Sequence, residues 1–287
     1  MPDPGGATSP REGLRAVGLS AAFLIGGFAL AAGLYGLAAS LLFGGAAPSL
    51  TDAALLQSGV SLVAFGLATS LIGLRAARLT ATDLRWIPGG PRALGRGAGL
   101  GAGAALAAMV VAVPAAGARW APDGGTATAW LGVVTRLVGL LLPAAFVEEL
   151  IFRGVPMVLL SRAFGRATAV LGLALLFALA HVLNPGITSL ALGNIALAGV
   201  FLGTTFYLPG GLWTATGAHL GWNATLAALG APVSGLPFAV PWLDYRPGGP
   251  AWLSGGPFGP EGGLTATVVL AAATVIAARF IRKETVT

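Results

Sequence analysis

The chain has 287 residues, of which 56% are hydrophobic and only 9% are charged, and its mean hydropathy is +0.85. About a quarter of the residues of a soluble domain are charged, so too few charges are present to wet the surface of a globule of this size. The net charge of +6 does not indicate nucleic-acid binding, because the arginines lie between apolar segments. The absence of cysteine excludes disulfides, thiolate metal sites and a cysteine nucleophile.

The lengths of the apolar segments predict a protein that crosses the membrane several times. A helix needs roughly 20 predominantly apolar residues to cross about 30 Å of hydrocarbon. We predict an all-α polytopic membrane protein, a bundle of about eight transmembrane helices. The expected spans are Val17 to Gly44, Ala53 to Leu74, Ala98 to Ala116, Trp130 to about Leu160, Ala167 to Leu183, Thr188 to Leu208, Leu212 to Leu229, and Leu264 to Ile281.

The basic residues predict the orientation of these spans. With a cytoplasmic N-terminus, twelve arginines and lysines fall inside and only Arg119 and Arg246 fall outside. This positive-inside bias predicts a multi-pass protein of the cell membrane with both termini in the cytoplasm. The twelve inside residues are Arg11, Arg15, Arg75, Arg78, Arg85, Arg92, Arg96, Arg162, Arg166, Arg279, Arg282 and Lys283.

Two connecting segments are unusual in composition. The first, RAARLTATDLRWIPGGPRALGR, holds five arginines and one aspartate, and we expect it to touch anionic lipid headgroups. The second, residues 230–263, is rich in proline and glycine and lies outside in the expected topology. It is either a loop on the membrane surface, with Trp242, Tyr245 and Trp252 at the interface, or a lid over an active site.

The segment GLGAGA, residues 99–104, fits the dinucleotide-binding pattern G-x-G-x-x-A. No predicted strand precedes it, and it begins an expected membrane span. We therefore interpret its small residues as a surface for close packing between helices, and not as a nucleotide site.

Strongly polar side chains are few in the last five spans, and they are concentrated. The fourth span contains Glu148, Glu149 and Arg153 within the sequence FVEELIFRGV. Both histidines of the chain, His181 and His219, fall in later spans. An ionised side chain at this depth costs on the order of 3 kcal/mol, so the retention of several of them indicates a functional site.

The spacing of these residues predicts which of them interact. Glu149 and Arg153 are i,i+4 neighbours on a helix and can pair, which lowers the cost of burying both. Glu148 points about 100° away, and a desolvated carboxylate not matched by a cation can act as a general base. His219 and Asn223 share a helix face by the same i,i+4 rule. We expect Glu148 and the two histidines to meet at one level of the membrane.

Each of these features also has an ordinary structural interpretation. A Glu–Arg pair can specify helix packing, and a histidine within the membrane can donate a hydrogen bond between helices. Phe177, four residues before His181, is a packing residue on physical grounds alone. The joint occurrence of a glutamate, both histidines and an asparagine at similar depth nevertheless favours a site.

Three short motifs occur in order on the fourth, fifth and seventh spans. They are EELIFR (E-E-x-x-x-R, 148–153), FALAH (F-x-x-x-H, 177–181) and HLGWN (H-x-x-x-N, 219–223). Between about Leu131 and Leu229 the chain resembles the CAAX-protease and bacteriocin-processing family of intramembrane endopeptidases, which includes the type II CAAX prenyl endopeptidases. The first three spans and the last one match that family only in hydropathy.

The resemblance implies a hydrolase, a protease whose partner is a peptide or protein substrate in or at the lipid bilayer. It implies that Glu148 activates the attacking water and that Glu149 and Arg153 orient the site. It further implies that His181 is catalytic or a metal ligand, and it supplies no chemical role for Phe177.

The resemblance also implies that His219 and Asn223 stabilise the oxyanion of a tetrahedral intermediate. It leaves a metal open, because the family is commonly called a metalloprotease family and can also be interpreted as glutamate-dependent enzymes. A catalytic zinc needs about three protein ligands, and the largest set here is His181, His219 and one carboxylate, Glu148. We favour a water activated by Glu148, with a divalent metal such as zinc as the alternative.

The chain is expected to divide into five parts. The parts are a cytoplasmic tail (1–16), three N-terminal helices (17–129), a catalytic core (130–229), an extracytoplasmic Pro/Gly-rich loop (230–263), and a C-terminal helix with a basic tail (264–287).

Two other functions stay open. The first is that of a catalytically silent immunity or scaffold protein. The second, with less support, is a transporter or proton relay, because intramembrane Glu and His also mark those proteins.

Overall fold

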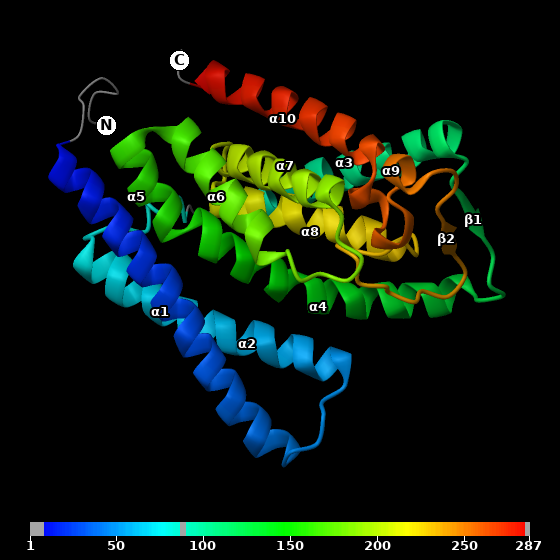
Figure 1. Cartoon of the computed structure of the whole chain (residues 1–287), viewed down its shortest axis with the longest axis horizontal. Coiled ribbons are helices and arrows are strands. Elements are labelled where there is room, and N and C mark those ends of the chain that lie inside the picture. Colours follow the sequence, from blue (N-terminus) through cyan, green and yellow to red (C-terminus); the bar gives the residue numbers. More distant parts are fainter. Residues whose placement is uncertain (1–8, 87–89, 285–287) are drawn as a thin grey trace. The chain divides into compact units, whose positions relative to one another are not determined.

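The structure is a computed structural model that describes residues 9–86 and 90–284 (Figure 1). Most of the described chain is helical, which confirms the all-α prediction. The helices are α1 (Pro10–Phe43), α2 (Leu50–Ala68, continued by the π-helix Thr69–Ala76), α3 (Gly90–Ala116), α4 (Ala127–Arg153), α5 (Val155–Phe164), α6 (Arg166–Ala180), α7 (Ser189–Phe206), α8 (Leu212–Ala228), α9 (Ala251–Ser254) and α10 (Leu264–Glu284).

Six helical segments of the described chain are long and apolar enough to cross a membrane. The prediction of a polytopic membrane protein is therefore confirmed, but the count of eight spans is not. The helix α6 has 15 residues and is about 22 Å long, shorter than the roughly 30 Å of hydrocarbon. The helix α8 has 17 residues, which is at the lower limit for a spanning helix.

The first helix is longer than the expected span. It starts at Pro10, whereas the span is expected to start at Val17; residues 1–8 and 285–287 of the two predicted tails lie outside the described residues, and the cytoplasmic position of the tails stays a prediction. Ser9 caps the helix, accepting from the Glu12 backbone N–H while the Glu12 side chain accepts from the Ser9 backbone N–H. This reciprocal capping box is a strong start signal, and it extends α1 well beyond its apolar segment.

The described chain forms two compact units. Unit 1 comprises residues up to Ile87 together with Leu142–Leu173, and unit 2 comprises Pro88–Leu141 together with Ala174 onward. The boundaries fall inside α4 and α6. The EELIFR motif therefore belongs to unit 1, and the FALAH and HLGWN motifs belong to unit 2.

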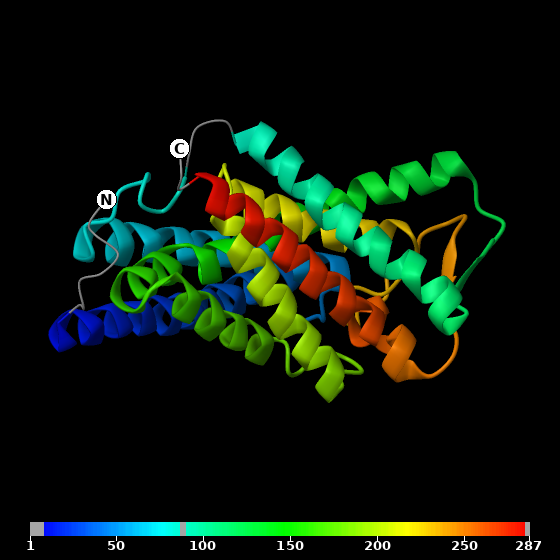
Figure 2. The same ribbon diagram turned by 90° about the horizontal axis from the view of Figure 1, so that it is seen from above.

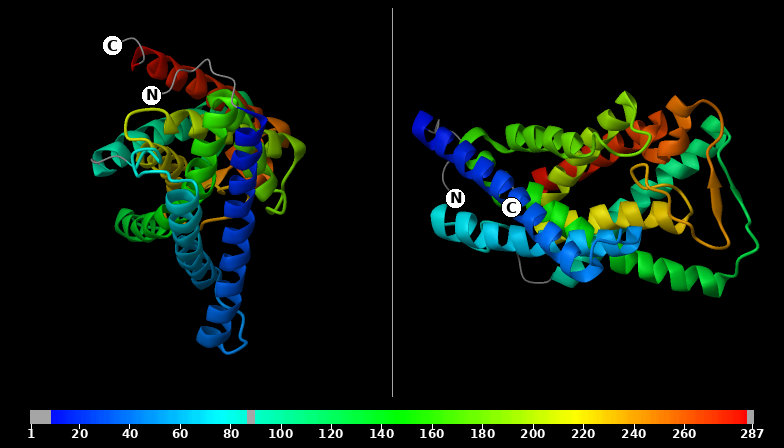
Figure 3. Two further views of the ribbon diagram at one scale, coloured as in Figure 1. Left: turned by 90° about the vertical axis from the view of Figure 1, so that its left-hand side faces the viewer. Right: turned by 60° about the horizontal axis from the view of Figure 1, so that its bottom comes forward.

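Within unit 1, α1 and α2 run side by side and are joined by a short connection (Figure 3). The ring of Phe65 on α2 is fully buried, 5.4 Å from the ring of Phe23 and 5.1 Å from that of Phe28 on α1. A Cβ at Gly27 would lie 2.3 Å from the Phe65 ring. The missing side chain of Gly27 is thus what lets the two helices approach around this aromatic cluster.

The expected fourth span is broken into two helices at Gly154. The helix α4 ends at Arg153 and α5 begins at Val155, because Gly154 adopts φ −78° and ψ −124°. A Cβ at Gly154 would lie 2.3 Å from the Leu150 carbonyl oxygen, so no other residue fits this turn without a shift. The break comes directly after the arginine of the EELIFR motif, and it fixes that residue at a helix end.

Within unit 2, α3 packs along α8 through glycines on both helices. A Cβ at Gly101 of α3 would lie 1.9 Å from the Ala218 carbonyl oxygen, and one at Gly217 of α8 would lie 2.1 Å from the Leu94 carbonyl oxygen. This confirms helix packing by the GLGAGA segment, because small residues let two backbones approach closely. The helix that carries the HLGWN motif is held by this contact, while α10 lies between α3 and α7 (Figure 2).

The Pro/Gly-rich segment 230–263 is folded onto unit 2. Its strand β2 (Asp244–Arg246) pairs antiparallel with β1 (Arg119–Ala121), and it continues into α9 and two short 3₁₀-helices, Gly256–Phe258 and Pro260–Gly262. Trp242 and Trp252 are exposed, as expected for interfacial residues, but Tyr245 is buried against Trp120 with its ring 5.5 Å away. The prediction of a surface loop is wrong for Tyr245, because the strand pairing turns its side chain inward.

Candidate functional site

The predicted ion pair of the EELIFR motif is present in unit 1. The Arg153 Nη1 lies 3.0 Å from the Glu149 Oε1, and the two side chains are 1% and 0% exposed. The i,i+4 spacing on α4 brings them together, as helical geometry requires. Each of these buried charges needs the other, because a buried charge without a partner loses its hydration and gains no ion pair in return.

Glu148 lies on the same helix and is half-buried. Arg153 also interacts electrostatically with Glu148, more weakly than with Glu149. Glu148 is therefore not isolated from the guanidinium, although it points away from Glu149 on the helix. All three charged residues of the motif form one electrostatic group.

In unit 2 a phenylalanine joins the two histidines. The Phe177 ring centroid lies 4.6 Å from the His181 ring and 6.0 Å from the His219 ring. The Phe177 and His219 side chains are buried, at 4% and 6% exposure, and His181 is half-buried. The structure thus brings both imidazoles to one aromatic ring, that of Phe177.

His181 does not lie inside a helix, contrary to the expectation that the fifth span reaches Leu183. The helix α6 ends at Ala180, and His181 is the first residue of the turn that follows. Its Nδ1 is 2.7 Å from the Phe177 carbonyl oxygen, the distance at which Nδ1–H donates to it. That carbonyl is at the end of the helix, where backbone oxygens have no intrahelical partner, so the contact both caps α6 and orients the imidazole.

His219 and Asn223 lie one turn apart on α8, as predicted. His219 is buried, whereas Asn223 is half-buried. Trp222, between them in the sequence, is 5% exposed, and its Nε1–H donates to Glu261 Oε1 at 3.0 Å.

Glu261 and Asn194 are buried polar residues near this motif that the sequence interpretation does not single out. Glu261 is 7% exposed and Asn194 is 2% exposed. An amide inside an apolar span is a signal that could have revealed Asn194. Glu261 follows a Pro/Gly-rich stretch just before the last span, and no pattern in the sequence distinguishes it from a surface acid.

The environment of Glu261 perturbs its carboxylate. Burial raises the pKa of Glu261 above its ordinary value, and hydrogen bonds from Ser234 and Trp222 and the charge of His181 oppose that rise. Burial likewise raises the pKa of Tyr245 to about 12. The charge of His181 thus acts on Glu261, a buried acid of unit 2.

The residues of unit 2 only partly suit a metal. His181 turns its Nδ1 to a backbone carbonyl, the arrangement that metal-ligating histidines commonly adopt. Within each unit, however, the described residues contain no group of three or more His, Cys, Asp or Glu side chains that could hold an ion. Of the three predicted ligands, unit 2 contains His181 and His219, one fewer than a catalytic zinc uses, and the third, Glu148, belongs to unit 1.

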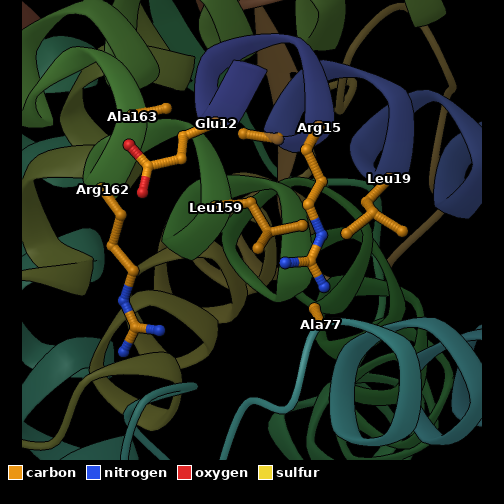
Figure 4. Close-up of a pocket in the computed structure, with 8 residues that line it drawn as sticks. Glu12, Arg15, Leu19, Ala77, Leu159, Arg162 and Ala163 are labelled. Atoms are coloured by element: carbon orange, nitrogen blue, oxygen red, sulfur yellow. The ribbon is translucent and has the colours of Figure 1, made fainter. Parts of the chain in front are cut away.

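A separate cavity of about 210 Å³ opens in unit 1 (Figure 4). Arg15 and Leu19 reach from α1 toward Leu159 on α5, and the Arg15 guanidinium donates to the Ala76 carbonyl oxygen at 3.0 Å. Arg162, also on the rim, pairs with Asp83. None of the predicted site residues lines this cavity.

The six predicted residues thus fall into two groups. The group of unit 1 consists of Glu148, Glu149 and Arg153, and the group of unit 2 consists of His181, His219 and Asn223. Contacts join members within the first group and join the two histidines through Phe177 in the second. The meeting of Glu148 with the histidines stays a prediction.

Comparison with known proteins gave one family match. Residues 129–225, about a third of the chain, match the family model described as Rce1-like, type II CAAX prenyl endopeptidase. The matched range contains all three motifs. Searches of curated proteins and of solved structures found no match. The resemblance seen in the three motifs is therefore confirmed, and over residues 129–225 this membrane protein is similar to the Rce1-like type II CAAX prenyl endopeptidases, a family of proteases.

Proposed function

We propose that this chain is an intramembrane endopeptidase that hydrolyses a peptide bond of a membrane-associated substrate. The observation that carries the proposal is the family match over residues 129–225, which contains the glutamate, histidine and asparagine motifs together. The buried Glu149–Arg153 pair and the two histidines on one phenylalanine ring support it. Ionisable side chains are costly to bury in a membrane protein, so their retention favours a functional role.

In the proposed reaction Glu148 takes a proton from water, and the resulting hydroxide attacks the carbonyl carbon of the scissile peptide. The carbonyl oxygen becomes an oxyanion, to which His219 and Asn223 donate hydrogen bonds. The C–N bond then breaks, and Glu148 returns the proton to the leaving amine. Glu149 and Arg153 hold the Glu148 segment of α4 in place, and His181 is either catalytic or a metal ligand. No step is assigned to a metal.

The family name indicates a class of substrate to test first. Type II CAAX prenyl endopeptidases suggest a peptide with a prenylated cysteine near its C-terminus. Such a peptide inserts its lipid into the bilayer, where the six apolar helical segments are expected to lie.

The first experiment compares wild type with Glu148→Gln in liposomes, using a quenched-fluorescence peptide that ends in a farnesylated CAAX sequence. Glu148→Gln keeps the shape of the side chain but removes the base, so we expect kcat to fall by at least about 100-fold. The matched control is Glu12→Gln, a carboxylate of unit 1 outside the three motifs. Cleavage that survives Glu148→Gln would reject the assigned base.

A further inference from the structure

A buried carboxylate outside the three motifs is hydrogen-bonded to the helix of unit 2 that carries His219. Glu261 belongs to the 3₁₀-helix Pro260–Gly262, directly before α10, and is 7% exposed. Asn194 on α7 holds the backbone around Glu261. Its Nδ2 donates to the carbonyl oxygens of Glu261 at 2.7 Å and Gly263 at 2.9 Å. The Thr267 Oγ1 in turn donates to Asn194 Oδ1 at 2.6 Å. The position of Glu261 is thus set by α7 and α10.

The two carboxylate oxygens of Glu261 accept from two different directions. Oε1 accepts from Trp222 Nε1 at 3.0 Å. Oε2 accepts from the Ser234 backbone N–H, and from Ser234 Oγ at 3.3 Å. A carboxylate is the side chain that suits this position, because it alone offers two acceptors and no donor.

These hydrogen bonds connect the two elements that carry the histidines. Trp222 lies between His219 and Asn223 on α8. Ser234 accepts with its carbonyl oxygen from Asn184 Nδ2 at 2.9 Å. Asn184 lies in the turn after α6, where its backbone N–H donates to the His181 carbonyl oxygen at 3.0 Å. The path from the His181 turn to α8 therefore runs through Asn184, Ser234, Glu261 and Trp222.

We propose that Glu261 is a positioning residue of the active site, holding the His181 turn and the helix of His219 and Asn223 in one fixed arrangement. This inference rests on the proposed function for its catalytic meaning, but the linkage itself is a property of the fold. It also gives the Pro/Gly-rich segment 230–263 a role, because the segment supplies Ser234 and Glu261 and so braces the histidines from outside the three motifs.

Substitution of Glu261 by glutamine tests the linkage with little change in volume. An amide has one acceptor oxygen and one NH₂ donor, so either Trp222 or Ser234 then meets a donor in place of an acceptor. Trp222→Phe breaks the same connection from the other side and keeps an aromatic ring. Asp244→Asn is the matched control, because it makes the same chemical change in the same segment at a surface pair, Asp244 with Arg246 at 2.6 Å.

The experiment measures kcat and KM on the farnesylated peptide with the full chain in liposomes. We expect Glu261→Gln and Trp222→Phe each to lower kcat by about 10- to 100-fold, because small misplacements of catalytic groups are costly. We expect KM to change by less than about twofold, because neither residue is assigned to substrate binding. Asp244→Asn should behave as wild type, and Ser234→Ala should have a weak effect, since its backbone N–H still donates.

A second readout does not depend on activity. Hydrogen–deuterium exchange should be faster in Glu261→Gln for peptides covering the turn after α6 and residues 230–240, and unchanged for α1 and α2. The positioning role would be overturned if Glu261→Gln had the same kcat and the same exchange rates as wild type. It would also be overturned if exchange became faster throughout the chain, because that indicates general unfolding. If wild type cleaves no peptide and Glu148→Gln is indistinguishable from it, the proposed function fails, and the local exchange pattern alone decides the linkage.

Discussion

Glu149 and Arg153 show what can be inferred at the scale of single residues. Their i,i+4 spacing predicts a pair, and the structure has that pair at 3.0 Å and almost without exposure. His219 and Asn223 likewise lie one turn apart on α8, as their i,i+4 spacing predicts. Local contacts of this kind are predictable because helical geometry alone sets the distance between such residues.

The buried pair makes a prediction about stability. Glu149→Gln and Arg153→Met each leave one buried charge without its partner, which costs about 3–5 kcal/mol. Replacing both residues by leucine removes both charges and should destabilise much less. Denaturation midpoints in detergent micelles would measure this difference.

The double substitution also serves as the control for general damage at this position. If the variant carrying both Glu149→Leu and Arg153→Leu were as unstable as either single variant, the ion-pair explanation would be contradicted. The double variant should still lack proteolytic activity if the pair orients Glu148.

Glu261 shows the limit of inference at the residue scale. Its partners Trp222 and Ser234 are 39 and 27 positions away in the sequence. No period or motif connects residues so far apart. Only the path of the folded segment 230–263 brings them together.

At the scale of helices, the glycines of α3 define a surface that faces α8. Gly101 would meet the Ala218 carbonyl oxygen at 1.9 Å if it carried a Cβ, whereas Gly103, two residues along, meets nothing within 4 Å. Two glycines of one helix thus differ only in the side to which they point. This makes them a matched pair for substitution.

We expect Gly101→Leu to destabilise unit 2 strongly, because its side chain would need space that the α8 backbone occupies. Overpacking of this kind typically costs about 1–3 kcal/mol even where side chains can adjust. Gly103→Leu should be neutral or stabilising by up to about 1 kcal/mol, since leucine is a better helix former than glycine. Thermal unfolding of the two variants, monitored by size-exclusion chromatography, would compare their stabilities. Equal unfolding midpoints would disprove the packing role of Gly101.

Helix boundaries were less predictable than the existence of the helices. The apolar segment continues through Val182 and Leu183 and so predicts that His181 is helical, yet α6 ends at Ala180. Hydropathy extends a predicted span wherever residues are apolar, whereas the turn depends on contacts such as that of Asn184 with Ser234. The break at Gly154 is not predictable for a similar reason, because one glycine does not interrupt an apolar pattern.

At the scale of the whole molecule, the positive-inside bias predicts cytoplasmic termini, and the absence of cysteine makes this testable. Single cysteines at Ala46 and Ala251 should react with a membrane-impermeant maleimide on intact cells, because both connections are expected outside. A cysteine at Thr82 should react only after permeabilisation. Labelling of Thr82→Cys on intact cells would reverse the predicted orientation.

The sequence by itself determined the all-α membrane class, the three motifs with their family resemblance, and the pairs one helical turn apart. These depend on composition and on a fixed local geometry. The tertiary structure decided where α6 ends, how Phe177 joins the two histidines, and that Glu261 reaches Trp222 and Ser234. Such contacts depend on how distant segments pack, and packing is decided by shape and by the need of buried polar groups for partners, which no local pattern records.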